Sequence, residues 1–497
     1  MTKGWKNGLL VALVAALVAG NVFVAVANTS RLKTFQYDFV AFYCAGQVAN
    51  EGRDPYLTEP LRTCEHRVGQ AFRPGSKLAI PVPIPGYVLP LFQGFGHLPF
   101  AIADALWIAL QLVVYALAVY ALVRLTGLSP PVVMAATLLS VLFVSLILGQ
   151  LVPLAVAALV FAAHALERNR PRSAALLATL ATIEPHLALP ALAALFALAQ
   201  RTRKTLLLCG GLLLGLQFCC DGLRGTVEYV TAVLPAQVRA EFHNEEQYSA
   251  SYAAVELGAQ DQLAERIGTV SYALAALLGI GLAGALARRR LGDGSLVLIP
   301  PAVVLFGGPY LHIQHIGAAV PAALWLYARA PEHRRRLAAF AVLLLAIPWG
   351  AFVDLMSVLP LVALATAILA RDLLRLRFTF ALALGALAAC AVVTAMSAFT
   401  LRPPADYSTL GGADAAFLAE RSWRVLIDTT FHGNVLLFTL ARIPTWLGLA
   451  ILIALGAQAA RGAGRGQDFE VHANRRTDAQ RTTPLNHEQT EVVPSWG

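Results

Sequence analysis

Six side chains that could do acid–base or binding chemistry are far apart in this sequence. In chain order they are Asp38, Gln150, Glu184, His186, His312 and His315. A carboxylate can take a proton from a hydroxyl group, and imidazole and amide groups can orient or stabilise a reacting anion. His312 and His315 are three residues apart, so they could share a helix face. A metal would need a third ligand, and the spacing supplies none, so we expect no metal and no cofactor.

The segment around Asp38 predicts a short helix. Residues 37–50, YDFVAFYCAGQVAN, end before Gly52, and their spacing puts Asp38, Ala41 or Phe42, and Ala45 on one face. A carboxylate above small residues can closely approach a ligand or a neighbouring helix. Aspartate also favours the N-cap position, so a structural capping role stays open, and the two roles are compatible.

The elements that position these residues must be membrane helices. The chain has 497 residues, of which 58% are hydrophobic and 13% charged, against about 25% charged in a soluble domain. Long apolar runs recur almost from end to end, and a bilayer can accommodate them whereas a soluble core cannot. This composition excludes a soluble enzyme, a secreted disulfide scaffold and a nucleic-acid-binding module. We expect an all-α, polytopic transmembrane bundle with about 12–14 spans.

The basic residues of the short connections predict an orientation. Arginine and lysine gather in alternate connections, for example at 168–172, 201–204 and 288–290, whereas 149–150 and 184–186 hold none. This alternation requires 173–184 and 187–199 to form a re-entering helical pair that breaks at Pro185. By the positive-inside rule, the protein then spans the cytoplasmic (inner) membrane with its N- and C-termini in the cytoplasm. The candidate residues would lie on the extracytoplasmic side.

The longer connections complete this organisation. One transmembrane domain would cover residues 1–459, with outer segments at 30–85, 221–268 and 400–434, and a disordered cytosolic tail would cover 460–497. Segment 221–268 could be a surface helix or a lid, and we expect a solvated loop.

Two cysteines share the first outer segment. An oxidising exterior would allow a disulfide between Cys44 and Cys64, and two free thiols are the alternative.

The polar motifs occur in a recognisable order. They are Tyr37-Asp38-Phe39, Tyr43-Cys44-Ala45-Gly46, Gly52-Arg53-Asp54-Pro55-Tyr56, Pro81–Pro85, Leu148-Gly149-Gln150, Glu184-Pro185-His186 and the segment Pro309–His315. Over roughly residues 8–330 the chain resembles the GT-C superfamily of membrane glycosyltransferases, in particular glycosyltransferase family 87. Beyond residue 330 it resembles only a helical bundle.

The resemblance implies transfer of a hexose, often mannose, from a polyprenyl-phosphate sugar to a lipid or glycan acceptor on the outer side. It implies an acidic base in the first outer loop, which is Asp38 here. We expect His312, His315 and Arg53 to stabilise the leaving phosphate. Further donor-binding candidates are Tyr43, Gln150, Glu184 and His186. Relatives often carry a basic residue in place of Glu184, so this chain departs from the pattern there.

Two other classes of function fit the span count. A secondary transporter or lipid flippase would place its essential polar groups near mid-membrane and show repeat symmetry, and neither feature is visible here. A non-catalytic envelope scaffold would leave the outer polar cluster unexplained. From the sequence we expect the protein to be surrounded by membrane lipids and to have no nucleic-acid partner. The oligomeric state stays open.

Overall fold

The computed structural model describes residues 37–68, 79–242, 244, 247–347, 349, 359–377, 380–385 and 435–461. The expected first helix, the outer segment 400–434 and the tail after Arg461 lie outside these residues.

The described residues form helices, together with one isolated β-bridge between Gln247 and His312. The α-helices are α2 (Tyr37–Asn50), α3 (Thr58–Val68), α4 (Leu89–Gly96), α5 (Phe100–Thr126), α6 (Pro130–Leu139), α7 (Val141–Leu148), α8 (Val152–Glu167), α9 (Pro171–Leu180), α10 (Pro185–Leu198), α11 (Arg203–Glu228), α12 (Leu234–Ala240), α13 (Ala250–Glu256), α14 (Asp261–Arg288), α15 (Ser295–Val304), α16 (Ala319–Arg329), α17 (Glu332–Ala346), α18 (Leu359–Leu374) and α21 (Val435–Arg461). Short 3₁₀ segments are η2 (Gly86–Val88), η3 (Ala181–Ile183), η4 (Gln200–Thr202) and η6 (Ile313–Ala318), and η5 (Tyr229–Val233) is a π-helical turn. The expected all-α fold class is confirmed.

Among the described residues, four helical stretches are long and apolar enough to cross a membrane. They are Phe100–Thr126, Gln200–Ala240, Asp261–Arg288 and Arg442–Arg461. Large hydrophobic side chains such as Leu207 and Leu212 are more than half exposed on α11, a surface that suits lipid rather than water. Four further apolar helices, α6, α8, α10 and α15, have 10–17 residues and are too short to span alone. Proline begins or interrupts each of them, so the long apolar runs of the sequence become broken helices.

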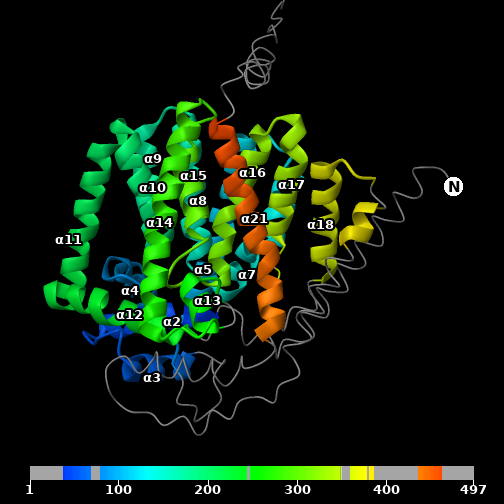
Figure 1. The fold of residues 1–497 in the computed structure, drawn as a ribbon. Coiled ribbons are helices and arrows are strands. Elements are labelled where there is room, and N and C mark those ends of the chain that lie inside the picture. The colour runs from blue at the N-terminus through cyan, green and yellow to red at the C-terminus, as the bar shows by residue number, and fades with distance from the viewer. Residues whose placement is uncertain are drawn as a thin grey trace, which may run out of the picture.

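The bundle has two chemically different ends (Figure 1), with α11, α14 and α21 running between them and α2, α3 and α4 together at one of them. At the other end, which we call the arginine end, Glu167, the last residue of α8, contacts Arg329 of α16 at 3.1 Å. The Nε of Arg289 also donates to the carbonyl of Ala460 there. The opposite end, which we call the site end, carries most of the candidate residues.

The expected break at Pro185 is present and separates two helices. Helix α9 and η3 lead to Glu184, and α10 begins at Pro185, where a missing N–H does no harm. Near the start of α10, the hydroxyl of Tyr272 in α14 donates to the carbonyl of His186 at 2.7 Å. At the end of α10, Leu198 lies against Gly284, which is further along α14. Helix α10 therefore runs parallel to α14, with Glu184 at the site end.

Segment 221–268 differs from the expected solvated loop. Helix α11 continues to Glu228, α12 and α13 follow, and Glu241, Asn244 and Gln247 are almost completely buried. The backbone N–H of Tyr248 donates to Leu311 at 2.7 Å. The expectation is wrong because these polar groups bond to one another and to the neighbouring backbone, and so do not need water.

Helices α2 and α3 pack with α4 and α5 around a group of aromatic side chains. Phe39 stacks on Trp107 with centroids 5.2 Å apart, and α2 meets α4 so closely that a Cβ on Gly46 would lie 2.0 Å from the carbonyl oxygen of Phe92. Cys44 and Cys64 form a disulfide that joins α2 to α3. Of the two alternatives that the sequence left open, a disulfide or two free thiols, the structure has the disulfide.

Removing this disulfide should loosen the segment that carries Asp38. The two cysteines are 20 residues apart, and closing such a loop restricts the unfolded chain by about 3 kcal/mol. We expect the C44S/C64S variant to melt several degrees lower in detergent. Cys219→Ser, at an exposed free cysteine of α11, is the control. Equal melting temperatures for both variants and the unmodified protein would contradict this stabilising role.

Candidate active site

Asp38 and Gln150 meet at the site end although 112 residues separate them. The side-chain amide of Gln150 donates to Asp38 Oδ2 at 2.7 Å. Asp38 is in the first turn of α2, where the helix dipole favours a carboxylate, and it is partly buried. One carboxylate oxygen is therefore oriented by a neutral donor.

The turn that presents Gln150 is fixed by α5. Gly149 adopts φ 78°, which ends α7 and which a residue with a side chain rarely adopts. The indole N–H of Trp107 donates to the carbonyl of Gly149 at 3.0 Å, and the amide of Gln111 donates to the carbonyl of Gln150 at 2.8 Å. Trp107 also stacks on Phe39, so a single side chain positions both partners of the Asp38–Gln150 pair.

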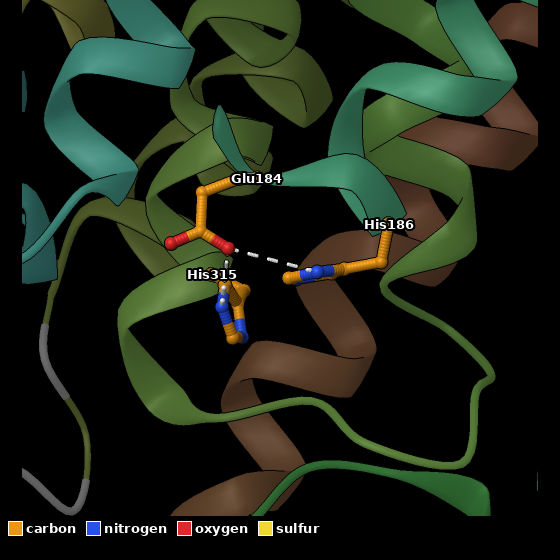
Figure 2. Close-up of side chains that lie close together, drawn as sticks. All are labelled: Glu184, His186 and His315. Atoms are coloured by element: carbon orange, nitrogen blue, oxygen red, sulfur yellow. Dashed lines mark ion pairs between the residues drawn. The ribbon is translucent and has the colours of Figure 1, made fainter. Parts of the chain in front are cut away.

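A second group unites Glu184, His186 and His315 (Figure 2). Glu184 Oε2 lies 3.7 Å from His186 Nδ1 and 3.8 Å from His315 Nε2. The two imidazole rings are nearly perpendicular, with centroids 4.2 Å apart. The start of α10 and η6 thus bring His315 next to Glu184 and His186, which precede it by 129 residues or more.

The backbone of η6 assigns the proton on His315. The N–H of His312 donates to His315 Nδ1 at 2.9 Å, so Nδ1 is an acceptor and Nε2 carries the hydrogen of the neutral ring. Burial lowers the pKa of His315 well below 6.5, in agreement with a neutral ring. The Nε2–H is directed toward Glu184, whose pKa burial raises to about 8.

The sequence spacing predicted no third metal ligand, but the fold brings three possible ligands together. Glu184, His186 and His315 are suitable residue types for a divalent cation, and their ligand atoms lie within 4.8 Å of one another. A metal on His315 Nε2 would leave the ring proton on Nδ1, facing the N–H of His312. The described arrangement therefore favours a hydrogen-bonding group over a metal centre.

His312 joins a buried polar network from segment 221–268. Its Nε2 lies 2.9 Å from the amide nitrogen of Asn244 and 3.7 Å from Glu241 Oε2. Gln247 donates to Glu241 at 3.2 Å and accepts from the backbone N–H of Leu311 at 2.9 Å. This network fixes the backbone on which His312 and His315 are placed.

Helix α21 contributes a buried cation to the same region. The Nε of Arg442 donates to the carbonyl of Gln247 at 2.8 Å, and its guanidinium group lies 4.2 Å from the ring centroid of Tyr252. Arg442 is 1% exposed. The stacking on Tyr252 contributes a cation–π attraction, so the C-terminal helix holds the segment that borders His312.

The two groups belong to one region of the fold. Ile183, next to Glu184, packs against the apolar cluster that contains Phe39 and Leu151. Helix α7, which ends just before Gln150, contacts both α2 and η6, and η6 includes Ile316. Phe39 follows Asp38, Leu151 follows Gln150, and Ile316 follows His315. A site between the two groups would thus be lined by Asp38 and Gln150 from one side and by the imidazoles from the other.

Two expected site residues have other roles in the structure. Arg53 is about half exposed and pairs with Glu51 at 3.5 Å. The hydroxyl of Tyr43 donates to the carbonyl of Leu98 at 2.8 Å, and its ring packs on Phe100. Neither side chain has a described contact with the other candidate residues.

Sequence reasoning missed Glu241, Asn244, Gln247 and Arg442. The run of polar residues after α12 was expected to form a solvated loop, and no role was expected for Arg442. The signal that could have identified Arg442 is its position within an apolar helix, directly before Ile443-Pro444. A charge inside such a helix requires a partner.

Comparison with known proteins provides one match. Residues 85–306 match the model of glycosyltransferase family 87. The matched range contains Gln150, Glu184, His186 and the Glu241 network, while Asp38, His312 and Arg442 lie outside it. No curated protein and no solved structure matches the chain.

Proposed function

Because residues 85–306 belong to glycosyltransferase family 87, we propose that this membrane glycosyltransferase uses a polyprenyl-phosphate sugar as its donor. The sugar is a hexose, with mannose the first candidate, and the acceptor is a lipid or glycan hydroxyl. Transfer takes place on the extracytoplasmic side, toward which the site end would face by the positive-inside rule, because its short connections 149–150 and 184–186 hold no arginine or lysine. The observation that carries this proposal is the pairing of a carboxylate with an amide opposite a group of buried imidazoles.

Asp38 is the general base of the proposed reaction. As the acceptor oxygen bonds to the anomeric carbon, the bond from that carbon to the phosphate oxygen breaks, and the hydroxyl proton passes to the Asp38 carboxylate. A single displacement inverts the anomeric configuration and develops oxocarbenium character, as in glycoside hydrolysis. The amide of Gln150 donates to Oδ2 and so holds the carboxylate in one orientation.

The Glu184, His186 and His315 group stabilises the leaving phosphate in this proposal. A neutral imidazole N–H and a protonated carboxyl group both donate hydrogen bonds, and fixed donors aimed at developing negative charge lower the barrier. The raised pKa of Glu184 resolves the departure from a basic residue at this position, because a protonated carboxyl group does not repel phosphate.

Incubating membranes that contain this protein with a radiolabelled polyprenyl-phosphate hexose tests the function. We expect label to appear in a lipid or glycan product, with the anomeric configuration opposite to that of the donor. Membranes without the protein provide the background. Movement of intact donor across the membrane without a transferred sugar would support a flippase instead.

Donor affinity should weaken as Glu184 ionises. The titratable groups that face this carboxyl group are His186, His315, Tyr87 and Tyr229. Below pH 8 Glu184 is neutral, and above it the negative charge repels the donor phosphate. We expect KM for the donor to rise severalfold between pH 7 and pH 9 with a smaller change in kcat.

Glu184→Gln separates this effect from other pH dependences. The glutamine keeps the size and a donor group but does not titrate, so KM for the donor should stay nearly constant from pH 7 to pH 9. The melting temperature of the variant controls for folding. The same rise of KM in the variant would exclude Glu184 as its cause.

A further inference from the structure

A cavity of about 460 Å³ lies at the arginine end, away from the elements of the candidate active site. It is bounded by the start of α6, the end of α16 and the end of α18, and it opens to the surface. Arg371, Arg375, Ser129 and Tyr327 supply its polar atoms, and Leu128 and Leu376 are among its apolar walls.

The two arginines of this cavity can converge on one anion. Arg371 lies in the last turn of α18, and Arg375 follows four residues later, just after the helix ends. Both side chains line the same opening. Arg375 has φ 55°, a conformation that non-glycine residues adopt at a cost, and it ends α18 beside the cavity.

The ion pairs between these arginines and their acidic neighbours are exposed. Arg375 Nη1 lies 3.2 Å from Glu332, and Arg371 Nε lies 3.7 Å from Asp372. All four side chains are more than one third exposed, and exposed ion pairs are weak. A guanidinium group has five N–H donors in a planar fork that matches two oxygens of a phosphate.

The remaining walls indicate an amphiphile rather than a free ion. Leu128, Val132, Leu373 and Leu376 line the cavity beside the charged groups. Helices α6 and α18 pack on each other below it, and α6 is one of the short apolar helices. An acyl chain that extends from the cavity along these helices would stay in contact with apolar side chains.

We propose that this cavity binds the headgroup of an anionic phospholipid, with its phosphate between Arg371 and Arg375 and its acyl chains along α6 and α18. A basic recess at the end of membrane helices offers charge attraction and apolar contact to the same molecule. The site lies at the opposite end from the candidate active site, so the proposal does not depend on sugar transfer.

Lipid binding to the purified, delipidated full-length protein tests this proposal. The probes are mixed micelles with phosphatidylglycerol, mixed micelles with phosphatidylcholine, and inorganic phosphate, with bound lipid counted by native mass spectrometry. We expect phosphatidylglycerol to bind at least tenfold more tightly than phosphatidylcholine and to raise the melting temperature. The R371Q/R375Q variant should lose at least tenfold in affinity for phosphatidylglycerol.

Matched variants and the third probe decide the outcome. R170Q/R172Q removes two arginines at the same end but outside the cavity, and its affinity should be unchanged. Should the double variant be unstable without lipid, Arg371→Gln alone should show the same loss in smaller measure. Equal binding of both phospholipids, equal stabilisation by inorganic phosphate, or unchanged affinity in R371Q/R375Q would each overturn the proposal.

Discussion

Replacing Asp38 by asparagine should lower the rate of sugar transfer by roughly 10²–10⁴-fold, the usual contribution of a general base. Asparagine keeps the shape of the side chain and can still accept the hydrogen bond from Gln150 at Oδ1 after rotation. It cannot take a proton from the acceptor hydroxyl. The loss should therefore appear in kcat, with folding and membrane insertion retained.

Asp54→Asn is the matched control for this prediction. Asp54 is an exposed aspartate of the same outer segment, and it accepts a local hydrogen bond from the N–H of Tyr56 at 2.8 Å, which asparagine can also accept. We expect its transfer rate to stay within about twofold of the unmodified protein. Full activity in Asp38→Asn would exclude Asp38 as the base, while equal losses in both variants would indicate a folding defect of the segment.

The protein should lose much of its folding stability at alkaline pH, and the Glu65→Gln variant should not. Glu65 of α3 is completely buried, and its Oε2 accepts the N–H of Ile80 at 2.9 Å. Burial raises the pKa of this carboxyl group from 4.5 to about 8. The stabilising contribution of the protonated form is fully present below pH 4.5 and is lost as pH rises through 8. Each pKa unit corresponds to 1.36 kcal/mol, so the loss at pH 9 is on the order of 4 kcal/mol.

The test compares melting temperatures in detergent at pH 5 and pH 9. The unmodified protein should melt lower at pH 9, whereas the Glu65→Gln variant, which keeps the acceptor for Ile80, should lose much less. Glu59→Gln, at an exposed glutamate of the same helix that pairs with Arg62, should behave like the unmodified protein. A steeper loss in Glu65→Gln than in the unmodified protein would reverse the sign of this argument.

Local sequence predicted the elements of this fold well because their signals are local. The helix over 37–50, the break at Pro185 and the all-α architecture follow from apolar periodicity, proline and composition. The resemblance to family 87 likewise rested on short motifs in a fixed order, and residues 85–306 match the model of that family. The segment after α12 was misread because a polar run looks the same whether water or a buried network satisfies it.

The sequence by itself determined a helical membrane protein with arginines at one end and with polar groups reserved for the other. Only the tertiary structure decided that Gln150 orients Asp38, that Glu184 meets His315, and that Arg442 of the last helix holds the segment beside His312. Hydrophobicity and helix breaks act over a few residues and can be read along the chain. Contacts across 100 residues or more depend on which helices pack together, and apolar helix faces of similar composition do not specify that choice locally.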